Sequence, residues 1–113
     1  MASPPPRLKR RAQFLRAAAE GRKVATAGLV LQALSRGDNA PTRLGFTVTK
    51  KIGNAVVRNR SRRRLKEAAR LVLAVHAPVG VDLVLIGREA TLRRRFADLQ
   101  NDLRRALARA GVA

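Results

Sequence analysis

A basic segment at residues 50–70 limits how this chain can pack. It reads KKIGNAVVRNRSRRRLKEAAR and holds nine positive side chains against one negative. In an α-helix, residues three and four apart share a face, so the basic and apolar positions separate onto opposite sides. Such a helix must lie on the surface, with its apolar side against a core. The basic side comprises Asn59, Arg62, Arg63, Lys66 and Arg70, flanked by Arg58 and Arg60, and the apolar side comprises Val57, Leu65, Ala68 and Val72.

The charge of the whole chain indicates a polyanionic partner. Its 113 residues include 25 Lys and Arg against 7 Asp and Glu, a formal net charge of +18. Self-repulsion on this scale favours a polyanionic partner, either nucleic acid or an anionic membrane surface. The apolar side of the basic helix lacks the Trp and Phe expected of a membrane-surface helix, and signatures of DNA-binding helices are missing. A folded RNA is the partner that fits best, with no membrane.

Length and composition predict one domain. Residues 1–7 are Pro-rich and are expected to be a disordered lead-in, and residues 8–113 a single domain. The chain has no cysteine and only one histidine, His76, which we read as a cation at a helix end. The first residues lack the apolar stretch of a secretory signal, so a cytoplasmic location is expected.

Hydrophobic periodicity predicts an α+β sandwich of order α-β-β-α-β-α. Gly28 is a weak point within the first strand, and Asn54 suits a helix N-cap. The expected elements are a helix at 8–20, a strand at 23–34, a turn at 35–42, a strand at 44–49, a helix at 55–76, a strand at 82–87 and a helix at 91–110.

Alternation in two of these strands predicts a small sheet with one open face. Leu44, Phe46 and Val48 fall on one side of their strand, with Gly45 and Thr47 opposite. The earlier strand repeats the pattern, with Leu29 and Leu31 on one side and Val30 and Gln32 on the other. A sheet with one apolar and one milder face is covered on one side only.

Side chains that could catalyse hydrolysis are sparse. Protein-only phosphodiester hydrolysis needs clustered carboxylates for Mg²⁺ or an acid–base pair. Only Asp98 and Asp102 share a helix face, and Arg94, Arg95 and Arg105 surround them in the pattern of a solvated, salt-bridged helix. We therefore expect no catalytic and no metal-binding residues in the protein.

The stretch at residues 50–63, K-K-x-G-N-A-V-x-R-N-R-x-[KR]-R, resembles the signature of the bacterial ribonuclease P protein. The resemblance implies an α/β sandwich with a left-handed βαβ crossover. It also implies a partner, the large catalytic RNA, which carries the active site and its Mg²⁺ and removes 5′ leaders from precursor tRNA. No small-molecule substrate is expected.

The resemblance also implies two binding surfaces. The basic helix and its start would face the catalytic RNA, and a cleft between the first helix and the open sheet face would hold the leader. The first surface comprises Lys50, Lys51, Asn54, Arg58, Asn59, Arg60, Arg62, Arg63 and Lys66, and the second comprises Phe14, Ala18, Val30, Gln32, Thr47 and Lys51.

Several positions depart from the family pattern. Ala18 and Gln32 stand where other members often carry aromatic rings, so leader contact should be weaker and depend more on backbone electrostatics. Lys66 replaces the usual arginine, and Arg64 replaces an apolar residue and is expected to extend outward. Two alternatives stay open: a structural RNA-binding protein of the ribosomal type, and a stand-alone nuclease.

Overall fold

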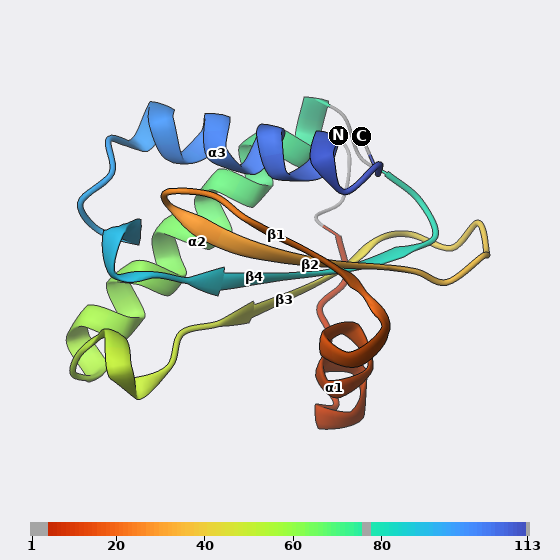
Figure 1. Cartoon of the computed structure of the whole chain (residues 1–113), viewed down its shortest axis with the longest axis horizontal. Coiled ribbons are helices and arrows are strands. Elements are labelled where there is room, and N and C mark those ends of the chain that lie inside the picture. Colours follow the sequence, from red (N-terminus) through yellow and green to blue (C-terminus); the bar gives the residue numbers. More distant parts are fainter. Residues whose placement is uncertain (1–4, 76–77, 113) are drawn as a thin grey trace.

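Within the part of the chain that the structure describes, the fold consists of three α-helices, two short 3₁₀ helices and four strands (Figure 1). The computed structural model describes residues 5–75 and 78–112. In chain order the elements are α1 (Arg11–Glu20), β1 (Arg22–Ala25), β2 (Leu29–Ser35), β3 (Arg43–Thr47), η1 (Lys50–Ile52), α2 (Ala55–Val75), β4 (Val81–Gly87), η2 (Glu89–Thr91) and α3 (Phe96–Arg109).

The four strands form one mixed sheet of order β1-β2-β4-β3, which confirms the α+β class. The β3 and β4 strands are parallel neighbours joined through α2, and the other pairs are antiparallel. This is the βαβ unit that the resemblance implies; its left hand stays a prediction. Both α2 and α3 lie on one side of the sheet, and α1 lies on the other (Figure 1).

The predicted strand at 23–34 is wrong in one respect, because it forms two strands. β1 and β2 pair as a hairpin whose turn includes Thr26 and Gly28. The hydroxyl and the backbone N–H of Thr26 both donate to the Leu29 carbonyl, each at 2.9 Å. A Cβ added at Gly28 would lie 2.5 Å from Oδ2 of Asp102 on α3. The weak point in the strand is therefore the turn, and the order becomes α-β-β-β-α-β-α.

The two-sided character of α2 is confirmed. Asn54 caps its start, since Oδ1 accepts the Val57 N–H at 3.0 Å. The helix extends to Val75, and His76 lies outside the described residues. Its buried side packs on the sheet and α3 and comprises Ser61, Leu65, Ala68, Ala69, Val72 and Leu73, with Val57 only half-buried.

The main core lies between the sheet and the helices α2 and α3. Leu29, Leu31 and Leu44 point into it from the strands, as their alternation predicts. Fully burying a leucine stabilises the fold by about 1.5–3 kcal/mol, so these positions hold the layers together. The α3 helix contributes Leu99, Leu103 and Leu107 to the same core.

A smaller core on the opposite face includes Leu8, Ala17, Leu34 and Val84. The face predicted to be open is thus covered at one end by α1. This helix begins at Arg11, later than predicted, because the preceding segment is extended along β3. The Leu8 N–H donates to the Leu44 carbonyl at 2.8 Å, and the Leu44 N–H donates to the Pro6 carbonyl at 2.9 Å.

The helix predicted at 91–110 is divided into η2 and α3. One of its two acidic residues, Asp102, is buried instead of exposed. Residues between η2 and α3 form a turn, from which Arg94 reaches back to Asp102. Both carboxylate oxygens of Asp102 accept from this guanidinium at 2.9 Å, and Asp102 is only 1% exposed. The expectation of a solvated salt bridge is therefore wrong for Asp102, which packs inward against Gly28.

A second buried carboxylate joins two strands and a loop. Asp82 on β4 accepts from Arg43 at 2.7 Å on each oxygen, and from Arg36 at 2.5 Å. Burial by itself would raise the pKa of Asp82, but the hydrogen bonds from Arg43 and Arg36 outweigh it, so the pKa lies below its ordinary value. Asp82 therefore stays ionised inside the fold.

Candidate RNA interface

The basic side of α2 faces solvent. Asn59, Arg60, Arg63 and Lys66 are exposed, and Arg62 is half-buried and donates to Asn59 Oδ1 at 3.1 Å. Within residues 5–75 and 78–112, the guanidinium groups of Arg60 and Arg63 form no ion pair and no hydrogen bond. Their guanidinium groups are available for bidentate contacts to phosphate.

A hollow of about 260 Å³ lies on this side of α2. Asn59, Arg62, Arg63 and Lys66 line it, so hydrogen-bond donors surround the space. Lys66 is exposed, but partial loss of water around its amino group lowers its pKa, and the nearby charges of Arg7 and Arg62 lower it further. Cations held this close repel one another, and a phosphate bound between them would relieve that repulsion. The structure thus brings four of the predicted RNA-binding residues together.

Four more of the predicted RNA-binding residues lie at the start of α2, apart from Arg60 on its basic side. Lys50 and Lys51 are exposed on η1, just before the first turn of α2. A helix start offers unpaired backbone N–H groups and a positive dipole end, which together favour an anion. Arg58 is held differently, because its side chain donates to the Gly53 carbonyl at 2.9 Å and braces this corner. Asn54 serves as the N-cap.

Arg64 does not belong to this surface. Its Nε donates to the Thr91 carbonyl at 3.1 Å, and a second N–H donates to the Arg94 carbonyl. Its guanidinium also lies 5.6 Å from the centroid of the Phe96 ring. The expectation that Arg64 extends outward is wrong: the side chain ties α2 to the segment before α3, where backbone carbonyls need donors.

Strand register places three of the predicted leader-binding residues on the α1 side of the sheet. Val30 and Thr47 both pair with Ile86. The side chains of Val30, Thr47 and Ile86 are half-buried. Gln32 lies in the next row, opposite Val84, which also pairs with Gly45.

Phe14 reaches the second of these rows from α1. A Cβ added at Gly45 would lie 2.5 Å from Cε1 of Phe14, so the ring packs directly on the strand backbone. Ala18 and Lys51 are exposed, on α1 and η1 respectively. The role of all these residues toward a leader stays a prediction.

Sequence reasoning missed three residues near these surfaces. Ile86 lies between Val30 and Thr47, but β4 is apolar throughout and its alternation is hidden. Arg7 and Phe46 were not assigned to a site, although the Arg7 guanidinium lies 4.7 Å from the centroid of the Phe46 ring. No local sequence signal links these two residues, because the contact depends on the pairing of the N-terminal segment with β3.

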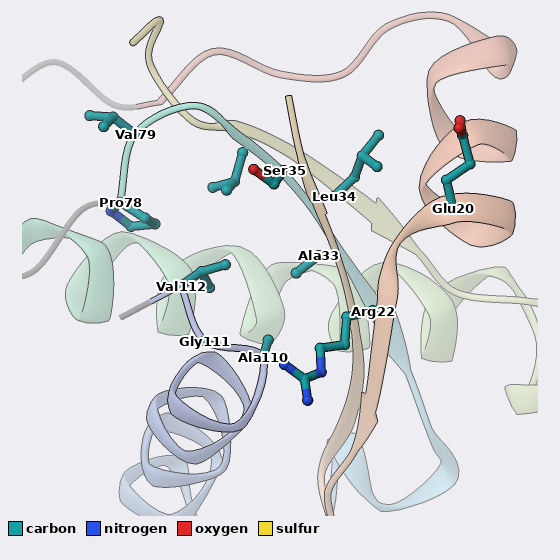
Figure 2. A pocket seen from close by; sticks show the side chains of 11 residues that line it. Glu20, Arg22, Ala33, Leu34, Ser35, Pro78, Val79, Ala110, Gly111 and Val112 are labelled. Atoms are coloured by element: carbon teal, nitrogen blue, oxygen red, sulfur yellow. The ribbon is translucent and has the colours of Figure 1, made fainter. Parts of the chain in front are cut away.

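A hollow of about 720 Å³ lies elsewhere, between β2, the start of β4 and the end of α3 (Figure 2). Most of the residues that line it are small or aliphatic, and they are joined by one acid, Glu20, and one base, Arg22. The Arg22 side chain extends toward Ala110 and Gly111 (Figure 2), where a cation interacts favourably with the negative end of α3. This lining lacks the concentrated positive charge of the α2 surface, so we do not assign the hollow to RNA.

No helix among the described residues is long and apolar enough to cross a membrane. In the same part of the chain, no three His, Cys, Asp or Glu side chains are grouped as metal ligands. Both fully buried carboxylates, Asp82 and Asp102, already accept hydrogen bonds from arginines on both oxygens.

A small α+β sandwich with one strongly cationic helix face defines the chain as a nucleic-acid-binding protein. The family model for ribonuclease P matches residues 3–111, and the chain belongs to the ribonuclease P protein family. This confirms the resemblance carried by residues 50–63.

Known relatives agree along almost the whole chain. The ribonuclease P protein component of Gluconacetobacter diazotrophicus is 64% identical over 106 residues, covering 94% of this chain and 91% of its own. That of Paramagnetospirillum magneticum is 52% identical, covering 94% and 83%. Among solved structures, the RNase P protein of Staphylococcus aureus superimposes with a TM-score of 0.78 at 30% identity, covering 94% and 95%. The Thermotoga maritima protein gives 0.77 at 32%, covering 91% and 96%.

Proposed function

We propose that this chain is the protein component of a ribonuclease P, in which it binds the catalytic RNA and the 5′ leader of precursor tRNA. The observation that carries the proposal is the exposed basic side of α2, in a member of the ribonuclease P protein family. The family supports this function over that of a ribosomal-type RNA-binding protein. We expect the particle to act in the cytoplasm during tRNA 5′ maturation.

The two surfaces bind different RNA molecules. The α2 side, with its hollow of donors at Arg62, Arg63 and Lys66, binds phosphates of the catalytic RNA. The sheet row formed by Val30, Ile86 and Thr47 is half-buried and largely apolar, which suits an unpaired leader strand. Phe14 offers a ring beside them for stacking.

Cleavage itself is assigned to the RNA. In metal-assisted hydrolysis of a phosphodiester, Mg²⁺ activates water and stabilises the leaving oxygen. The buried carboxylates of this protein are bonded to arginines, so the RNA would hold the ions. The protein contributes binding and orientation, which lower the Mg²⁺ concentration that the RNA needs.

A reconstitution at low Mg²⁺ tests the proposal. The full chain is added to its cognate ribonuclease P RNA, and the 5′ cleavage of precursor tRNA is followed over time. We expect cleavage well above that of the RNA alone, and none from the protein without RNA. Equal rates with and without protein would refute the proposal, and cleavage by protein alone would instead support a stand-alone nuclease.

The leader surface has its own test. The holoenzyme's affinity for precursor tRNA is compared with that for the same tRNA without its leader, with wild-type protein, Phe14→Ala and Phe14→Leu. Phe14→Leu retains apolar packing over Gly45 but lacks the ring. Because stacking contributes about 1–3 kcal/mol per base, both variants should reduce the leader-dependent increment. An unchanged increment in both would remove Phe14 from the leader site.

A further inference from the structure

A second hollow adjoins the basic side of α2 and has a different chemical character. It has a volume of about 290 Å³, and we call it the Phe46 groove. Leu44 and Phe46 of β3 provide apolar lining, and Arg7, Arg63 and Lys66 add positive charge. An apolar surface next to several cations suits a ligand that is itself part apolar and part anionic.

Arg7 is fixed in this groove by the backbone around it. The residues on either side, Pro6 and Leu8, are hydrogen-bonded to Leu44, so the segment lies along the edge of β3. The Arg7 guanidinium is thereby held over the half-buried Phe46 ring, at 4.7 Å from its centroid. A guanidinium plane is a surface on which nucleic-acid bases stack, and it adds positive charge at the same point.

The Phe46 groove shares Arg63 and Lys66 with the polar hollow described above. The two spaces are therefore contiguous, with donors alone on one side and apolar lining on the other. Glu67 lies in the Phe46 groove, where its carboxylate is paired with Arg70 at 2.5 Å. This negative charge disfavours a phosphate there and leaves the polar hollow as the phosphate position.

We propose that the Phe46 groove binds the base of one unpaired nucleotide of the catalytic RNA, stacked on Arg7, with its phosphate in the hollow at Arg62 and Lys66. The inference rests on the proposed function, because it names what the α2 surface recognises besides phosphates. Phosphate contacts alone carry no base-sequence information, whereas a base can enter this groove only where the strand is unpaired. The groove would thus set the register of the protein on its RNA.

Crosslinking from the groove identifies its occupant. Phe46 is replaced by the photoreactive p-benzoylphenylalanine in the full chain, which is assembled with catalytic RNA and precursor tRNA and irradiated. We expect a crosslink to one unpaired nucleotide of the catalytic RNA. A crosslink to the leader would overturn the assignment to the catalytic RNA, and crosslinks only to helical segments or to none would overturn the base site.

A charge-matched pair of variants tests the stacking. Arg7→Ala and Lys9→Ala each remove one positive charge from the same segment, but Lys9 is not in the groove. We expect Arg7→Ala to weaken binding to the catalytic RNA about fivefold or more beyond Lys9→Ala, in line with loss of one stacking contact. Arg7→Lys retains the charge without the plane and should fall near Arg7→Ala. Thermal unfolding of each variant confirms that it is folded.

The two proposals fail in different ways. If the wild-type chain does not bind the catalytic RNA, the proposed function is wrong. If it binds normally and Arg7→Ala, Arg7→Lys and Lys9→Ala behave alike, the RNA interface stands and only the base site is refuted.

Discussion

Two sets of arginines differ in this molecule, although their side chains are the same. Arg36, Arg43 and Arg94 are bonded to buried carboxylates and join strands, loops and α3. Arg60 and Arg63 on α2 are exposed, and among the residues that the structure describes they have no acceptor. The first set holds the fold together, and the second is left for a polyanion.

The difference lies in what surrounds each guanidinium. An arginine beside a buried carboxylate compensates a charge that would otherwise be costly inside the protein. An arginine without such a partner remains hydrated until a phosphate replaces the water. A chain with so few acids therefore divides its arginines according to the positions of those acids.

Removing a buried acid should have the largest effect. Asp82→Asn leaves Arg36 and Arg43 without their shared carboxylate, and breaking a buried pair in this way costs about 3–5 kcal/mol. Urea denaturation measures the free energy of unfolding. The matched control is Glu67→Gln, whose pair with Arg70 is exposed and should contribute less than about 1 kcal/mol. Equal losses in the two variants would contradict the distinction between the sets.

Neighbouring arginines on α2 offer a sharper comparison. Arg64→Ala removes hydrogen bonds to the carbonyls of Thr91 and Arg94, so the free energy of unfolding should fall by about 1.5–3 kcal/mol. Arg63→Ala, one residue earlier and exposed, should change it by no more than about 0.5 kcal/mol. Denaturation of the two single variants side by side checks this, and a larger loss for Arg63→Ala would reverse the assignment.

For RNA binding the order is reversed: the exposed arginines of α2 should matter and Arg64 should not. Arg60→Ala and Arg63→Ala each remove a phosphate contact, so the log–log dependence of affinity on salt should become shallower by about 0.7–0.9 per contact. Arg64→Ala should leave the slope unchanged, because its guanidinium is bonded inside the protein. Salt titration of binding to the catalytic RNA measures all three. An unchanged slope for Arg60→Ala and Arg63→Ala would show that these side chains are not on phosphates.

The ion pairs of Asp82 with Arg36 and Arg43 should lose their contribution to stability only at low pH. The pKa of Asp82 lies below its ordinary value of about 3.9, so its stabilising contribution is complete above that pH. The contribution is lost as the pH falls through the lowered pKa, because the protonated acid no longer pairs with arginine. The difference in unfolding free energy between wild type and Asp82→Asn should be constant at pH 5–7 and shrink only below about pH 4. A difference that shrinks already above pH 5 would be inconsistent with a lowered pKa.

Hydrophobic periodicity predicted most of the helices and strands correctly. The alternation of β2 and β3 places their leucines in the core as predicted. The basic side of α2 is also exposed as predicted, since one helix presents its own two sides whatever it packs against. Turns were less predictable: Gly28 weakened the predicted strand, but only the antiparallel pairing of β1 with β2 shows that the chain reverses there.

Roles that depend on a distant partner could not be predicted. Arg64 precedes Leu65 in a run of arginines, and nothing in that run indicates that it would bond to carbonyls near α3. Asp102 has the helical spacing of a surface residue, yet it lies inward because Arg94 and the hairpin turn enclose it. In each case the partner lies far along the chain or in a turn of irregular shape.

By itself, then, the sequence determined the α+β class, the two-sided helix and the family, because these follow from local periodicity and from a contiguous motif. The tertiary structure alone decided which arginines are bonded inside the fold and which face outward. It also brought Arg7 onto Phe46, a contact between the N-terminal segment and β3. Charge is a property of each residue, whereas its availability to RNA depends on the acceptors that folding brings within reach.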